Sequence, residues 1–258
     1  MQTQHLFLIP PMFDTLGSAV ARSLAQGQGR LVAAGYGMAA LGPVEGAGVI
    51  VDQAIFGRAG AGLKGFFPLA GARARAMAEM LDGPVGRIVV PMMALDQAYP
   101  MLWRQQAIRR VMPDFDGLGP KFCRFKRGWA EVVEDLIAAF APEEVVVLHA
   151  PVSSAQVLSA LVPDAGLAAI EPVSNVIPDT AIAMLQRLYR QGVEVPPKQV
   201  MRMIEQHQHA LQPAPLAQFA PEDRAEMRRH FATEMERLAA MPHVRIGLDG
   251  LDFANAAQ

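Results

Sequence analysis

The sequence predicts an α/β fold, in which a three-layer, P-loop-like parallel sheet is flanked by helices and followed by a helical C-terminal part. Short apolar runs rich in β-branched residues recur along the first 150 residues and are too short for helices. Segments with helical periodicity lie between these runs, and strands that alternate with helices form parallel sheets covered on both faces. From about residue 153 onward the pattern is mostly helical.

Short apolar runs are the expected strands. The first covers residues 6–9 and stops at Pro10 and Pro11. Its continuous apolar character is typical of a strand buried on both faces. The next three strands are expected at residues 49–51, 88–90 and 145–148, and a run at residues 243–248 is expected to return to the sheet as its last strand.

The expected helices lie between and after these strands. A helix over residues 16–26 follows the first strand, and Asp14 or Thr15 can cap its start. Glycines mark its end, at Gly27 and Gly29. Further helices are expected over residues 69–82, over residues 97–111 and around the apolar stripe from Val132 to Phe140. In the C-terminal part, prolines that suit a first helical turn begin three more helices, at Pro178, Pro197 and Pro221.

The composition indicates a folded chain without a nucleic-acid or membrane partner. Of the 258 residues, 52% are hydrophobic and 19% are charged, which provides enough apolar surface for a sizeable core. The net charge of −2 gives no long-range attraction to nucleic acid or anionic lipid. We expect a single domain over residues 1–248, followed by a loose, small and polar tail over residues 249–258.

The cysteine and histidine pattern argues against disulfides and metal sites. The single cysteine, Cys123, has no internal disulfide partner. His207 and His209 are two residues apart on an expected helix and therefore point to different faces. No run is apolar for long enough to span a bilayer, and the N-terminus lacks the basic start of an export signal. We therefore expect a reduced, cytoplasmic protein.

Candidate catalytic residues are few and weak. Ser18 lies outside a GxSxG motif, which argues against a serine hydrolase, and no GxGxxG loop supports a reductase. His149 lies at the carboxyl end of an expected parallel strand, where open α/β sheets bind ligands, and is either a catalytic or a structural histidine. Cys123 lies in the basic segment 121–127, which either lowers the pKa of the thiol or is simply a solvated loop.

The order of these segments resembles the sulfotransferase-like P-loop family, in its bacterial branch of short single-domain members. The resemblance covers nearly all of residues 5–248. The stretches that carry it are the opening strand, loop and helix at residues 6–24, residues 49–57, 67–68, 73–81 and 87–103, residues 128–133 with the strand that follows, and residues 219–239.

The resemblance implies a central parallel sheet and a sulfate donor, PAPS, which is a sulfated adenosine bisphosphate. In such enzymes a loop rich in glycine, lysine and threonine follows the first strand and wraps the 5′-phosphate with backbone amides. Its lysine stabilises the departing oxygen. An arginine near a later strand end, and a serine eight residues further on, hold the 3′-phosphate.

The first loop of this chain departs from that pattern. Pro10 and Pro11 lack the N–H groups that surround an anion. Phe13 stands at the lysine position, and Asp14 places a negative charge beside the expected phosphate. The residues of this degenerate loop are Met12, Phe13, Asp14, Thr15, Gly17 and Ser18.

The second anion site departs as well. Met93 stands at the arginine position and Met101 at the serine position, with Asp96 between them. Asp52 and Gln53 replace a serine–glutamate pair that is common in this branch, so a carboxylate base is shifted or lost. Both sites have become apolar or acidic, which indicates the loss of PAPS binding, and no other cofactor or metal is expected.

Our leading hypothesis is a non-catalytic binding module for a small molecule or a protein. Met12, Phe13, Met92, Met93 and Met101 either line an apolar cleft for that ligand or fill the vacated site as core. The alternative is an active transferase with an altered donor or a rearranged anion site. Its phosphate contacts would come from Arg104, Arg109, Lys121 or Arg124, and its proton transfer from His149 or Asp14.

Overall fold

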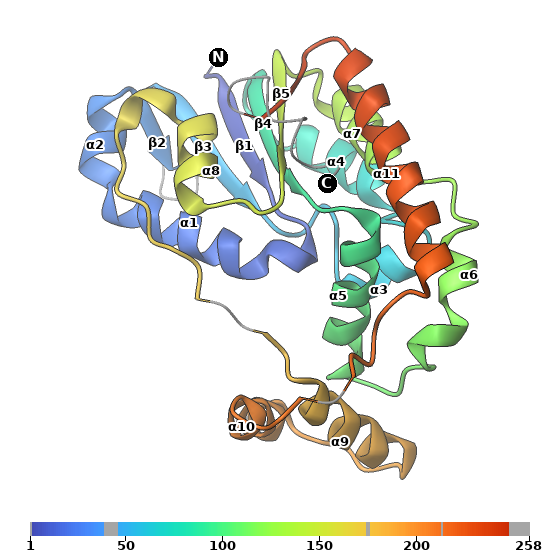
Figure 1. Ribbon diagram of the computed structural model, residues 1–258. Coiled ribbons are helices and arrows are strands. Elements are labelled where there is room, and N and C mark those ends of the chain that lie inside the picture. The colour runs from blue at the N-terminus through green and yellow to red at the C-terminus, as the bar shows by residue number, and fades with distance from the viewer. Residues whose placement is uncertain (1, 39–45, 174–175, 213, 248–258) are drawn as a thin grey trace.

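The computed structural model describes residues 2–38, 46–173, 176–212 and 214–247. Its six strands form one all-parallel sheet in the order β2-β3-β1-β4-β5-β6, with helices on both faces (Figure 1). The predicted fold class is therefore confirmed. The strands are β1 (Gln4–Leu8), β2 (Tyr36–Met38), β3 (Ala47–Asp52), β4 (Val85–Met92), β5 (Glu144–His149) and β6 (Val244–Ile246).

The sheet is buried most deeply at its centre. In β1, Leu6 pairs with Ile50 of β3 on one side and with Ile88 of β4 on the other. The side chains of Leu6, Phe7 and Leu8 are all inaccessible to solvent, as expected for a strand with a continuous apolar run. Because every strand is parallel, all carboxyl ends lie along one edge of the sheet, where α/β proteins place their ligands.

Helices cover the two faces of the sheet in separate groups. Figure 1 shows α1, α2 and α8 on one side and α4, α7 and α11 on the other. The helices before α8 are α1 (Asp14–Gln26), α2 (Gln28–Ala33), α3 (Ala59–Leu63), α4 (Ala70–Ala78), α5 (Leu95–Ala107), α6 (Gly119–Phe122) and α7 (Trp129–Phe140). Short 3-10 helices add η1 (Pro11–Phe13), η3 (Phe115–Gly117) and η4 (Pro163–Ala165).

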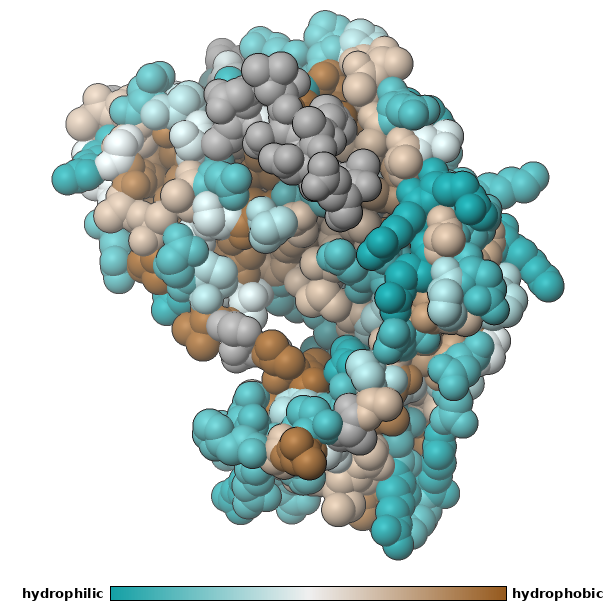
Figure 2. All heavy atoms as spheres, viewed as in Figure 1, coloured by the Kyte–Doolittle hydropathy of each residue, from teal (hydrophilic) through white to brown (hydrophobic). Residues whose placement is uncertain are grey.

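The C-terminal part is mostly helical, as predicted, and includes a helical hairpin away from the sheet. Its helices are α8 (Ser154–Leu161), α9 (Asp179–Arg190), α10 (Pro197–His207) and α11 (Pro221–Ala240). Figure 1 shows α9 and α10 beyond the end of α5, while α11 returns to the sheet body. The hairpin has a small core of its own, formed by Ala181, Leu185, Val200 and Ile204. Figure 2 shows hydrophilic residues along the outward side of α11.

Two local expectations were wrong. The first helix begins at Asp14 rather than at residue 16, with Phe13 before it and no side-chain cap, so neither Asp14 nor Thr15 is the N-cap. Gly27 does follow the end of α1, but Gly29 lies inside the next helix, α2. The short elements β2, α2, α3 and α6 were not predicted, because three to six residues carry too little periodicity to stand out.

No helix among the described residues has the length and apolar character needed to cross a membrane. The tail predicted at residues 249–258 lies outside the described residues.

Candidate functional site

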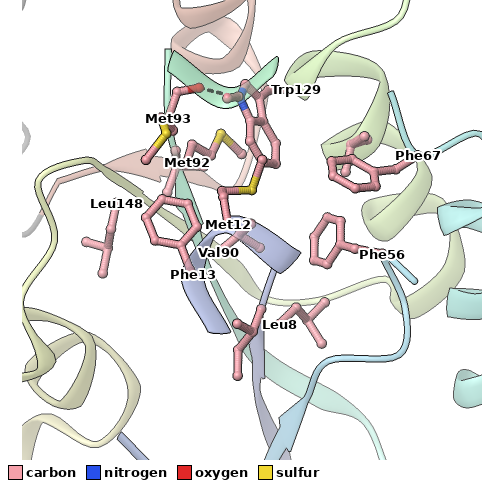
Figure 3. Packing of buried hydrophobic residues seen from close by; sticks show 14 of the residues in the cluster. Leu8, Met12, Phe13, Phe56, Phe67, Val90, Met92, Met93, Trp129 and Leu148 are labelled. Atoms are coloured by element: carbon pink, nitrogen blue, oxygen red, sulfur yellow. Dashed lines mark hydrogen bonds between the residues drawn. The ribbon is translucent and has the colours of Figure 1, made fainter. Parts of the chain in front are cut away.

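The space enclosed by the loop after β1 is occupied by side chains of the loop itself. Met12 and Phe13 are only 5% and 7% exposed. Figure 3 shows both side chains directed into a cluster that includes Val90, Met92 and Trp129. Pro10 and Pro11 have no N–H, and the N–H of Phe13 is bonded to the carbonyl oxygen of Pro10 at 2.8 Å. These loop residues therefore present no ring of free amides to an anion.

The other residues of this loop have structural contacts. Gly17 is buried where α1 crosses the end of β1, and a side chain there would overlap Ile9. The hydroxyl of Ser18 donates to the carbonyl oxygen of Asp14 at 2.9 Å, within one turn of α1, and Thr15 is half-buried in the same turn. Asp14 is exposed to solvent. Partial burial raises the pKa of its carboxyl, and the positive charge of Arg109 opposes part of this rise.

The second predicted site is part of the packed core. Met93 is buried, and its carbonyl oxygen accepts a hydrogen bond from Nε1 of Trp129 at 2.8 Å. Met101 is half-buried on α5 and packs against the same core. Asp96 is buried at the start of α5, and its Oδ2 lies 3.0 Å from Nε of Arg228 on α11. Met92, Met93 and Met101, which were expected either to line a cleft or to fill the site, therefore pack as part of the hydrophobic core.

An open pocket of about 560 Å³ lies at the carboxyl ends of β1 and β3. We call it the arginine pocket, because Arg58, Arg73 and Arg109 line it together with the single carboxylate of Asp14. Its remaining polar lining consists of glutamine side chains, Gln53, Gln105 and Gln106. Of these residues, only Arg109, Asp14 and Gln53 were considered for a site from the sequence. The others come from three separate segments, which no local motif brings together.

The loop between β3 and α3 builds one wall of the arginine pocket. Oδ1 of Asp52 accepts hydrogen bonds from the backbone N–H groups of Ala54 and Ile55, both at 2.9 Å. Asp52 therefore holds a turn, which is a structural role for this carboxylate. Gly57 has a φ of 69° and no side chain, and the guanidinium of Arg73 lies in the space that a Cβ would take. Nη1 of Arg73 also reaches the carbonyl oxygen of Ile55 at 3.4 Å.

The basic residues proposed for a rearranged anion site lie in different places. Arg109 lines the arginine pocket. Arg104 instead lies 2.8 Å from the carboxylate of Asp179 and connects α5 to the helical hairpin. Lys121 and Arg124 are exposed on α6 and just after it, and neither lines the arginine pocket. Only one of the four thus lines the arginine pocket.

His149 lies at the carboxyl end of β5, as the sequence predicts. Its ring centre is 5.3 Å from that of Phe231 on α11, and burial lowers the pKa of the imidazole. Its Nε2 is buried and has no hydrogen-bond partner among the described residues. His149 does not line the arginine pocket, so the structure does not bring the two candidate proton-transfer groups, His149 and Asp14, to one site.

Cys123 is a poor nucleophile in this environment. Its Sγ lies 3.7 Å from Oδ1 of Asp223, and burial together with this carboxylate raises the pKa of the thiol to about 11. The hypothesis that the basic segment lowers this pKa is therefore wrong. Arg127, from the same segment, instead bonds to the carbonyl oxygen of Phe66 and to the carboxylate of Asp135. Among the described residues, no three histidine, cysteine or acidic side chains gather as metal ligands.

Comparison with protein-family models, with curated proteins and with solved structures found no match. The resemblance to sulfotransferases therefore stays a prediction from the sequence.

Proposed function

We propose that this chain is a non-catalytic binding module with a sulfotransferase-like fold that no longer binds PAPS. The observation that supports this proposal is the filled loop after β1, where Met12 and Phe13 occupy the place of a phosphate cradle. A phosphate site needs convergent N–H groups and cations. Here the loop has two prolines, and the first turn of α1 carries the negative charge of Asp14.

The energetics work against a phosphate at this position. A phosphate next to Asp14 meets like charge, and it finds the amide of Phe13 already bonded to Pro10. To open the loop, the side chains of Met12 and Phe13 would have to leave the core. Removing a buried phenylalanine side chain alone costs about 3 to 5 kcal/mol. This cost would offset much of the binding free energy of a nucleotide.

The test is a thermal-shift titration of the whole chain with adenosine 3′,5′-bisphosphate, the product of PAPS, and with PAPS itself. A ligand at a hundred times its dissociation constant stabilises a protein by about 2.7 kcal/mol, which is an easily measured rise in Tm. We expect no rise at millimolar nucleotide. A saturable rise in Tm would contradict the proposal.

A transferase with a rearranged anion site is the second candidate, because Arg109 and Asp14 line the same pocket. In that case the arginine would hold the anionic donor and the carboxylate would accept the proton of the attacking group. The two candidates differ in turnover. If the chain transfers sulfate from PAPS to a phenol, and Asp14→Asn abolishes this transfer, the transferase is favoured. If no transfer is detected, the binding module is favoured.

We further propose that the protein acts in the cytoplasm and binds a small molecule or a protein rather than nucleic acid or a membrane. The net charge of −2 and the single cysteine support this proposal.

A further inference from the structure

We propose that the arginine pocket binds a small polyhydroxy compound that carries a phosphate or sulfate ester, such as a sugar phosphate. This inference gives the proposed binding module its ligand class, and so it rests on that proposed function. It places the ligand beside the closed loop after β1 rather than inside it.

The charge of the pocket favours an anion. Arg58, Arg73 and Arg109 bring three positive charges against the one negative charge of Asp14. In the described part of the chain, none of the three guanidinium groups has a carboxylate within ion-pair distance. Guanidinium groups bind phosphate and sulfate oxygens through paired N–H donors. The pocket therefore has unused cationic donors at the edge of the sheet.

Arg73 has side-chain donors that the described residues leave unused. It comes from α4 and lies over Gly57, where the Cβ of any other residue would stand 2.9 Å from the guanidinium carbon. The one hydrogen bond of its side chain to a described residue is the long contact of Nη1 with the carbonyl oxygen of Ile55. Most of its side-chain donors are thus left for a ligand, and Gly57 leaves the space that the guanidinium occupies.

Glutamine side chains without partners provide a second reason to expect a polar ligand. Gln106 lines the pocket, is only 7% exposed, and makes no side-chain hydrogen bond to any described residue. Its amide atoms are not buried away from solvent, so they are open to a ligand that enters the pocket. Gln105 is already fixed, since its Nε2 donates to the carbonyl oxygen of Pro11 at 2.8 Å. The free amide groups of Gln53 and Gln106 suit the hydroxyls of a sugar.

The rest of the lining argues against a nucleotide in this pocket. The residues that line it include no aromatic side chain on which a base could stack. Instead, small residues such as Ala54, Ala59 and Ala61 complete the lining. A volume of about 560 Å³ accommodates a monosaccharide ester with its bound water.

The experiment is calorimetric titration of the whole chain with glucose 6-phosphate, glucose 6-sulfate, inorganic phosphate, glucose and adenosine 3′,5′-bisphosphate. We expect at least one sugar ester to bind more tightly than inorganic phosphate, and glucose alone not to bind. The phosphate and sulfate arms identify which ester is preferred. Arg73→Gln and the exposed Arg58→Gln should each weaken binding by about tenfold or more, because each removes charge-assisted hydrogen bonds.

Matched variants separate this site from general charge effects. Arg75→Gln removes an exposed arginine of the same helix, outside the pocket lining, and should leave binding unchanged. Gln106→Leu should reduce sugar-ester affinity to that of inorganic phosphate. Failure of both sugar esters to bind, or equal losses in Arg73→Gln and Arg75→Gln, would overturn the inference. Nucleotide binding that Arg73→Gln leaves unchanged would instead overturn the proposed loss of PAPS binding.

Discussion

The carboxylate of Glu234 on α11 occupies the space beside Gly128 where any other residue would place its Cβ. Glu234 is only 1% exposed, and its Oε2 accepts a hydrogen bond from the backbone N–H of Trp129 at 3.1 Å. The carboxylate thus lies at the start of α7, where free N–H groups and the helix dipole favour negative charge. This contact joins α11 to the helix that packs on the sheet.

The first prediction concerns the close approach at Gly128. Gly128→Ala should destabilise the protein by about 1 to 3 kcal/mol, because the methyl group displaces a buried carboxylate from its N–H donor. Urea unfolding measures the change. Gly117→Ala is the control, since a Cβ at that glycine meets no atom within 4 Å. Equal stability of the two variants would contradict the packing described here.

The second prediction is a pH dependence that comes from Glu234. Burial raises the pKa of this carboxyl from its ordinary value of 4.5 to about 7. Between these values the folded protein binds more protons than the unfolded chain, so stability falls as the pH rises. The loss reaches about 3 kcal/mol above pH 7. Glu234→Gln keeps an acceptor for Trp129 and removes the charge, so it should be more stable than the parent at about pH 8.

Urea unfolding at about pH 5 and at about pH 8 measures this dependence. Other groups titrate over the same range, including His149, whose lowered pKa gives the opposite slope. The comparison of variant with parent isolates the contribution of Glu234. Glu236→Gln, on the exposed side of the same helix, should leave the slope unchanged. If the stability of the parent and of Glu234→Gln changes with pH in the same way, the pKa of the Glu234 carboxyl is not raised.

The third prediction concerns how the helical hairpin is attached. Arg104 of α5 lies 2.8 Å from the carboxylate of Asp179, which also accepts the N–H of Leu216 at 3.2 Å. Arg104→Gln leaves Asp179 buried without its cation, and we expect a local loss of about 2 to 3 kcal/mol. Amides of α9 should then exchange faster while those of β1 stay protected. Arg187→Gln on the exposed face of α9 is the control. Faster exchange in both elements would mean that the pair stabilises the whole fold.

The elements that could be predicted from the sequence are those with long or strongly patterned runs. The β1 run and the apolar stripe of α7 each produce a buried face by themselves, so a local pattern is sufficient. The start of α1 was misplaced because Asp14, a common N-cap residue, lies in the first turn of the helix. Phe13 is the residue before α1, and burial of its ring in the core determines where the helix begins.

The candidate site could be predicted only in part, for a similar reason. The filled loop after β1 could be expected from Pro10, Pro11 and Phe13, which are neighbours in the sequence. The arginine pocket depends on tertiary placement, because Arg58 and Arg73 reach it from a loop and a helix with no shared motif. The role of Asp52 also required the structure, since two hydrogen bonds to its own turn distinguish a structural carboxylate from a base.

The fourth prediction addresses whether the loop after β1 can be converted into a phosphate site. Phe13→Lys returns the lysine of the resembled family, but it places an ammonium group at a position that is only 7% exposed. We expect a loss of at least about 3 kcal/mol, from the lost phenyl packing and the desolvated charge, and no gain of adenosine bisphosphate binding. Unfolding and nucleotide titration measure both. Ser18→Lys, at an exposed position of α1, should cost less than about 1 kcal/mol. A stable Phe13→Lys variant that binds the nucleotide would mean that the loop opens readily despite Pro10 and Pro11, and the filled core would then be only a closed state of a working site.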